Sequence, residues 1–213
     1  MDASPNNAPP LWAVGAGLSA NFVTYSGANA LYASNLGMLS GSGASPLISP
    51  LAFLEYRLDT ALRVFVQPEF YYSQNKFENE TKSRYSGGYS VGVGLRWIAN
   101  PKGLVEVGMA HMLYVASSSY RAPTTLIPTN SGVAQSAWAT PTTETFGTAT
   151  ALVAERMLLP RLWLRVAATM FRAYLAKTTV TEEVENRESN SSHSNSASIR
   201  FGFEPSLSLR LAF

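Results

Sequence analysis

Two histidines are the side chains of this sequence that come nearest to catalytic chemistry. His111 and His193 are the only histidines, and a histidine oriented by an acid beside a serine is how many hydrolases activate a nucleophile. His193 precedes Ser194, but both lie in the polar segment ENRESNSSHSNSAS, while Met112 and Leu113 follow His111. A triad needs fixed geometry, which neither setting indicates. The sequence therefore predicts no catalytic residue.

An acidic run near the C-terminal quarter could attract a divalent cation. It contains Glu182, Glu183, Glu185 and Glu188, but it lacks the regularly spaced oxygen ligands and turn glycine of a calcium loop. The chain has no cysteine, which excludes thiolate metal sites and disulfides. We expect a solvated loop here, and neither a metal nor a cofactor.

Eleven other charged residues share one property: each lies on the polar side of a segment in which apolar and polar residues alternate. Buried charges persist only when they are paired, and arginine forks suit bidentate contacts with carboxylates. Six arginines against five glutamates is a composition suited to a confined, nearly neutral interior. We expect them to form a network inside the fold: Glu55, Arg57, Arg63, Glu69, Arg96, Glu106, Glu155, Arg165, Arg200, Glu204 and Arg210.

Alternation with a period of two predicts strands along the whole chain. Eight segments show it: 11–24, 49–58, 62–73, 88–98, 104–115, 146–157, 162–175 and 197–213. The connections are short around Asp59, Pro101 and Pro160, and the others are long, at 25–48, 74–87, 116–145 and 176–196. Short turns at one end and long loops at the other are typical of outer-membrane barrels. We predict an all-β fold, an eight-stranded antiparallel up-and-down transmembrane β-barrel over residues 11–213 after a flexible N-terminal tail, residues 1–10.

Periodicity does not say whether the apolar face fills a core or meets lipid, so a soluble ligand-binding barrel remains the alternative. A sheet surface that faces water normally carries lysines in its strands, but the four lysines of this chain all lie in or beside predicted loops and turns: Lys76, Lys82, Lys102 and Lys177. Aromatic residues also sort by height, as expected of two membrane interfaces. Those at the short-turn end are Trp12, Trp97, Trp163 and Phe213, and those at the long-loop end are Tyr25, Tyr72, Tyr89, Tyr114 and Tyr174. Both observations favour lipid.

Three polar residues fall on the side predicted to face lipid: His111, Arg156 and Arg172. The two arginines lie near opposite interfaces, where long side chains can reach the headgroups. For His111, a β-bulge in the fifth strand would turn it inward. Pro68 and Pro205 each remove a ladder donor, so we expect kinks or bulges there.

The terminal segment RFGFEPSLSLRLAF, with the loop pattern, resembles the small eight-stranded outer-membrane β-barrels of Gram-negative bacteria, the OmpA/OmpX-like class. The resemblance implies a location in the bacterial outer membrane and contact with its lipid and lipopolysaccharide. It also implies that Phe213 is a signal read by the barrel-insertion machinery. No signal peptide and no peptidoglycan-binding domain are visible in the chain.

The predicted long loops carry apolar residues that are unusual in water: Tyr32, Leu36, Met38, Ile127 and Trp138. Exposed apolar patches mark contacts, so these loops either bind a surface partner protein or pack together over the barrel. We expect a non-enzymatic protein that presents its loops for surface interaction or envelope integrity. The alternatives are a narrow pore or conduit for small, even apolar, solutes, and a lipid A-modifying enzyme. The net charge of +2 gives no reason to expect nucleic acid.

Overall fold

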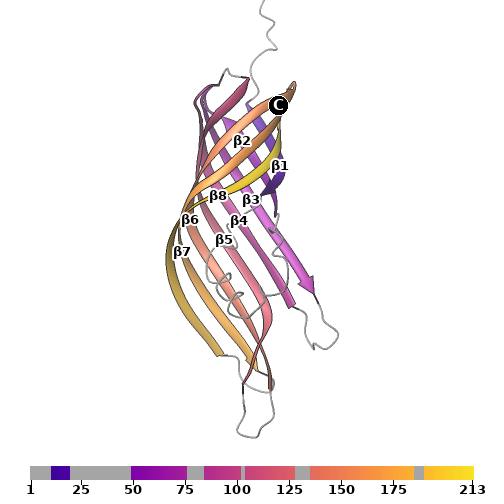
Figure 1. The fold of residues 1–213 in the computed structure, drawn as a ribbon, viewed down its shortest axis with the longest axis vertical. Coiled ribbons are helices and arrows are strands. Elements are labelled where there is room, and N and C mark those ends of the chain that lie inside the picture. The colour runs from indigo at the N-terminus through magenta and orange to yellow at the C-terminus, as the bar shows by residue number, and fades with distance from the viewer. Residues whose placement is uncertain (1–10, 20–48, 76–83, 102–103, 128–134, 185–189) are drawn as a thin grey trace, which may run out of the picture.

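The computed structural model describes residues 11–19, 49–75, 84–101, 104–127, 135–184 and 190–213. The described residues form eight β-strands in a closed antiparallel barrel (Figure 1). No helix long and apolar enough to cross a bilayer occurs among them. The strands are β1 (Trp12–Ser19), β2 (Ser49–Arg57), β3 (Leu62–Asn75), β4 (Arg84–Ile98), β5 (Val105–Ile127), β6 (Gln135–Leu159), β7 (Leu162–Val184) and β8 (Asn190–Ala212).

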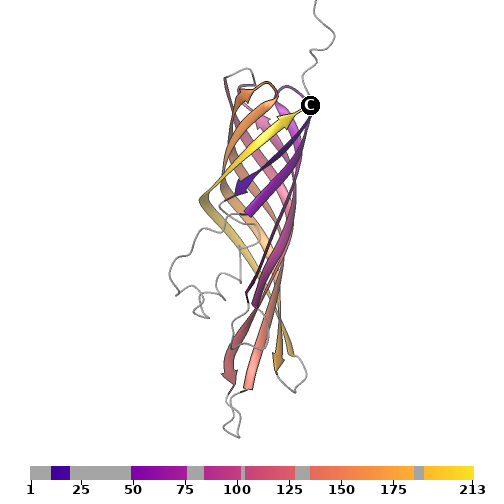
Figure 2. The same cartoon turned by 90° about the vertical axis from the view of Figure 1, so that its right-hand side faces the viewer.

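Each strand pairs with its neighbours in the chain, and β1 closes the ring against β8. Gly17 lies opposite Ser208 across this closure, and the backbone N–H of Phe213 donates to the carbonyl of Trp12 at 2.9 Å. The C-terminus thus lies at the end that holds the short turns (Figure 2). The predicted eight-stranded up-and-down barrel is confirmed.

The outer wall of the barrel is apolar and its interior is charged. Along β5, Val105, Val107, Met109, Leu113 and Val115 are each at least 40% exposed. Ten residue steps from the first to the last, at about 3.4 Å each and tilted by roughly 40°, give a band about 26 Å tall. This height matches the hydrocarbon layer crossed by a membrane barrel. The faces therefore have the polarity of a transmembrane barrel, the reverse of a soluble one.

Strands β5 to β8 are longer than predicted. They contain 23 to 25 residues each, so the predicted loops 116–145 and 176–196 are largely strand. Above the apolar band both faces are rich in serine and threonine, and a strand with two polar faces lacks the alternation by which we identified the others. On the outer face, Glu144 and Lys177 lie opposite one another just above the band.

A register shift in β7 corrects the prediction made for Arg172. Against β6, Thr169 pairs with Ala151 but Phe171 pairs with Thr150, so Met170 is an extra residue. A bulge of this kind reverses the faces of the residues that follow it. Arg172 is consequently 4% exposed and turned inward, where we had expected it to face lipid.

The other residues that fit the predicted alternation poorly are Pro68, Pro205, His111 and Arg156, and the structure treats them differently. Near Pro205 the register between β7 and β8 shifts, because Thr169 pairs with Glu204 but Phe171 pairs with Phe201. The register between β3 and β4 runs through Pro68 without a shift. Strand β5 keeps its parity through His111, which stays on the outer face, so the bulge expected there is absent. Arg156 is exposed near the short turns.

The predicted aromatic girdles are correct only in part. Tyr114 and Tyr174 are 2% and 5% exposed, so they fill the interior instead of reaching an interface. Trp163 is half-buried beside the guanidinium of Arg210, 5.9 Å from its ring centre. The side chains that do lie exposed on the outer wall are those of Trp12, Trp97, Phe213 and Tyr89. Tyr25 lies outside the described residues, and Tyr72 lies in β3.

Candidate functional site: the charged lumen

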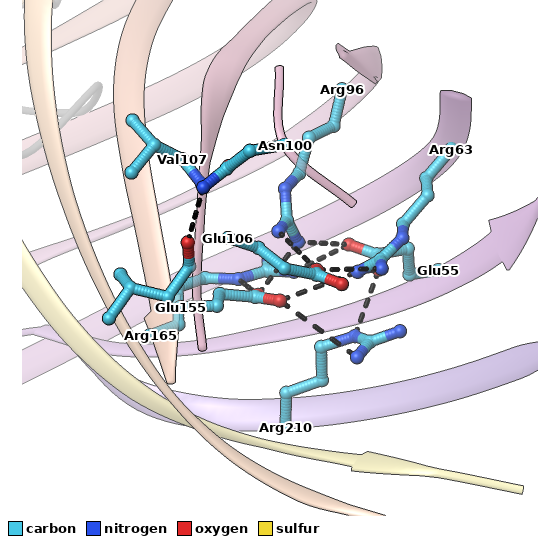
Figure 3. Close-up of polar contacts among 10 residues, drawn as sticks. Glu55, Arg63, Arg96, Asn100, Glu106, Val107, Glu155, Arg165 and Arg210 are labelled. Atoms are coloured by element: carbon cyan, nitrogen blue, oxygen red, sulfur yellow. Dashed lines mark hydrogen bonds and ion pairs between the residues drawn. The ribbon is translucent and has the colours of Figure 1, made fainter. Parts of the chain in front are cut away.

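Seven charged side chains meet inside the barrel near its short-turn end, one from each strand from β2 to β8 (Figure 3). Each is at most 8% exposed. We call this set the charge ring: Glu55, Arg63, Arg96, Glu106, Glu155, Arg165 and Arg210.

Glu55 is the main hub of the charge ring. One carboxylate oxygen accepts from Arg63 at 3.1 Å and from Arg210 at 2.9 Å. The other accepts from Arg96 at 3.3 Å and from Arg165. A single carboxylate thus ties together four strands besides its own.

The other two carboxylates complete the network. Glu155 accepts from Arg96 at 2.7 Å, from Arg63 at 3.3 Å and from Arg165. Glu106 accepts from Arg63 at 2.9 Å. The charge ring holds four arginines and three glutamates, a net charge of +1.

A local backbone device holds Glu106 in place. In the turn between β4 and β5, the side-chain amide of Asn100 donates to the carbonyl of Val105 at 2.7 Å, and its oxygen accepts from the N–H of Val107 at 2.6 Å (Figure 3). Both partners flank Glu106. The turn therefore fixes the start of β5 so that the carboxylate enters the ring.

Glycines on neighbouring strands make room for aromatic rings beside the charges. Phe53 lies opposite Gly15 on β1, and a Cβ at Gly15 would lie 1.9 Å from that ring. The Arg165 guanidinium stacks on Phe53, 3.9 Å from the ring centre. Strand β1 thus places no charged side chain in the charge ring, and its Gly15 leaves room for the Phe53 ring instead. Two further pairs repeat the arrangement: Phe65 with Gly94, and Tyr114 with Gly147.

A second polar group lies higher in the lumen. Arg172, turned inward by the bulge, donates to Glu204 at 2.7 Å. Glu69, which is 6% exposed, accepts from the side-chain amide of Gln67 at 2.7 Å. Sequence reasoning missed Arg172 and Gln67. The adjacent apolar pair of Met170 and Phe171, which breaks the alternation, is the signal that could have revealed Arg172.

Of the eleven charged residues predicted for the interior, the structure brings the seven of the charge ring into one cluster and places Glu69 and Glu204 above it. Arg57 is half-buried at the end of β2. Arg200 pairs with Arg172 across β7 and β8 but is exposed, with its guanidinium 5.8 Å from the ring centre of Tyr174.

An internal cavity of about 70 Å³ lies between the charge ring and the upper polar group. Arg96 and Arg165 line it from the ring, and Glu69 and Arg172 line it from above. Small or apolar side chains form much of the remaining wall, among them Ala110, Met112, Ala149, Ala151 and Val153, and further polar groups come from Gln67, Thr169, Ser206 and Ser208.

The two histidines lie away from these charges. On the outer wall, His111 hydrogen-bonds through its two ring nitrogens to Thr150 at 2.8 Å and Thr148 at 3.0 Å. His193 lies on exposed β8, 3.0 Å from the hydroxyl of Thr179. Among the described residues no cluster of three potential metal ligands occurs.

The acidic run and the predicted loop residues have mixed outcomes. Glu182 is exposed, and Glu183 pairs with Arg121 at 2.5 Å. Trp138 lies in β6, 5% exposed, with the Arg121 guanidinium 5.7 Å from its ring centre. It is therefore a packed strand residue, whereas we had predicted an exposed loop residue. Ile127 ends β5. The remaining predicted positions lie outside the described residues: Tyr32, Leu36, Met38, Glu185 and Glu188.

Solved structures to which the chain is similar include outer-membrane proteins. The chain is similar to a major outer membrane protein from Thermus thermophilus, at 12% identity over 95% of this chain and 98% of that one, with a TM-score of 0.49. It is also similar to the outer membrane protease OmpT from Escherichia coli, at 8% identity over 96% and 94% of the chains, with a TM-score of 0.33. The sequence matches no protein-family model and no curated protein.

Proposed function

We propose that this chain is an integral protein of the bacterial outer membrane whose lumen is closed by the charge ring. On this proposal its role is non-enzymatic. It is a rigid scaffold that holds the polar upper parts of β5 to β8, and the loops between them, above the membrane for contact with a surface partner or with lipopolysaccharide.

The charge ring is the observation that carries this proposal. It crosses the lumen from β2 to β8, and its members are nearly inaccessible to solvent. An eight-stranded barrel is only wide enough for its own side chains to fill. A network in which every glutamate contacts at least two arginines therefore acts as a plug as well as a cross-link.

Two measurements test the proposal together. The first compares folding in buffer with folding in detergent micelles, by far-UV circular dichroism and by gel migration before and after heating. We expect β-structure and a heat-dependent shift only with micelles, because the apolar band needs an apolar solvent. The second is planar-bilayer recording, where we expect no steady conductance. Folding as a soluble monomer would contradict the membrane assignment, and a steady conductance would contradict the closed lumen.

A narrow pore is the second candidate, and the cavity above the charge ring favours it. Here the ring would be a constriction, with the cavity as a vestibule on its loop side. The pore predicts a conductance that changes when Arg96 or Glu69, which both line the cavity, is replaced by glutamine.

A further inference from the structure

Three polar atoms that line or border the luminal cavity have no hydrogen-bond partner among the described residues. They are Oε2 of Glu69, Nε of Arg96 and Nη1 of Arg172. The three residues are 6%, 1% and 4% exposed, and all three line the same cavity. A buried polar atom without a partner is costly and rare, so the meeting of three at one cavity needs an explanation.

The bulge at Met170 is an independent observation that points to the same place. Without the extra residue, Arg172 would face lipid with the other members of its parity. The bulge keeps Thr169 in the cavity wall and adds Arg172 to it. Bulges are enriched beside functional sites because they redirect a side chain.

Size and charge restrict what could occupy the cavity. A volume of about 70 Å³ corresponds to roughly five water-sized spheres. The charge ring carries +1, and Glu69, Arg172 and the half-buried Glu204 above it carry −1, so the charges of the two groups balance. A charged occupant would upset this balance in a medium of low dielectric constant. The occupant is therefore small and neutral.

We propose that the luminal cavity is a binding site for a small neutral polar solute of the amide or urea kind. Its carbonyl oxygen accepts from the guanidinium of Arg96 or Arg172, and its N–H donates to Oε2 of Glu69. The alanines and Met112 of the wall set an upper limit of about five non-hydrogen atoms. This site goes beyond the scaffold function and does not require that the lumen conduct.

Acetamide is a suitable probe because it offers one carbonyl, one NH₂ group and a single methyl. The full chain, isotopically labelled in micelles, is titrated while backbone amide shifts are followed by NMR. We expect saturable shifts at the cavity residues Ala151 and Ser206 and none at Ala154 on the outer wall. Hexanamide, which exceeds the cavity, should give no saturable shift at either cavity residue.

Matched variants test where the probe binds. Ala151→Leu fills the cavity and should weaken acetamide binding at least tenfold, whereas Ala154→Leu adds the same atoms on the outer wall and should leave it unchanged. Glu69→Leu removes the acceptor and should also weaken binding at least tenfold. Heat-dependent gel migration confirms that each variant is folded, and Arg172→Met replaces any variant that is not.

Three outcomes would overturn the proposal. The first is a linear, non-saturating response in the wild type, which indicates a cavity that holds water only. The second is equal saturable binding of hexanamide. The third is wild-type affinity in folded Ala151→Leu. None of these results bears on the scaffold function, which depends on the closed ring and not on the cavity.

Discussion

Replacing Glu55 by glutamine should cost more stability than any other single charge neutralisation in the lumen. Glu55 is 1% exposed and contacts Arg63, Arg96, Arg165 and Arg210. Glutamine keeps the shape and one acceptor oxygen, but it removes the negative charge and turns an NH₂ group toward guanidiniums. The charge ring then holds four arginines and two glutamates.

Breaking a buried ion pair by removing one partner costs about 3–5 kcal/mol, because the other charge stays buried without compensation. We expect a loss of about 4 kcal/mol in the free energy of unfolding for Glu55→Gln. With a urea dependence of roughly 2 kcal/mol per M, the unfolding midpoint should fall by roughly 2 M. Urea titration in micelles, followed by the fluorescence of the four tryptophans, measures this shift.

Two comparisons make the result interpretable. Glu144→Gln neutralises an exposed glutamate on the outer face and should change stability by less than about 0.5 kcal/mol. In the double variant Glu55→Gln with Arg210→Gln, the second change removes a charge left unpaired by the first, so part of the loss should be recovered. A loss under about 1 kcal/mol for Glu55→Gln, or the same loss for Glu144→Gln, would refute the view that the ring holds the barrel together.

Three further changes test other parts of the structure in the same urea assay. Gly15→Val should cost about 1–3 kcal/mol by overpacking, since its Cβ would overlap the facing phenylalanine ring, whereas Gly202→Val, with nothing within 4 Å, should cost far less; equal costs would contradict the packing. His111→Lys should cost about 2–4 kcal/mol if His111 lies near the middle of the bilayer, against about 0–1 kcal/mol for Ser117→Lys above the band, and equal effects would contradict the assigned depth. Arg161, in the turn between β6 and β7, has a φ of 71°, so Arg161→Gly should stabilise by about 0.5–1 kcal/mol through relief of strain, which a lower midpoint would disprove.

The strands inside the apolar band could be predicted because two solvents impose the alternation. Each outward side chain there must suit lipid, and each inward one must suit a narrow charged interior, so every second residue changes character. Above the band this contrast disappears. The Thr- and Ser-rich parts of β5 to β8 looked like loops for that reason, although threonine is itself a good strand residue.

It was harder to predict which luminal residues pair with one another than to predict which residues face the lumen. The side of each strand told us that Glu55 and Arg165 point inward, but not that they meet, because strand tilt and register decide height in the barrel. The failure to predict the bulge at Met170 had the larger effect on the predicted interior. One inserted residue reversed the faces of Arg172 and Tyr174 and moved both into the interior.

The carboxylates at the two levels of the lumen are paired to different degrees. In the charge ring, every carboxylate oxygen of Glu55 and Glu155 has at least one arginine partner. Above the cavity, one oxygen of Glu69 and one nitrogen of Arg172 have none among the described residues. Within the described part of the chain, Nε of Arg63 and Nε of Arg96 are the unpaired atoms of the charge ring, and both belong to guanidiniums that make other ion pairs. A buried carboxylate paired through both oxygens helps to specify one structure, whereas one paired through a single oxygen is costly unless something else completes it. The charge ring therefore determines stability, and the group above the cavity determines binding. For this reason a variant of Glu55 should lower stability, whereas a variant of Glu69 should weaken binding.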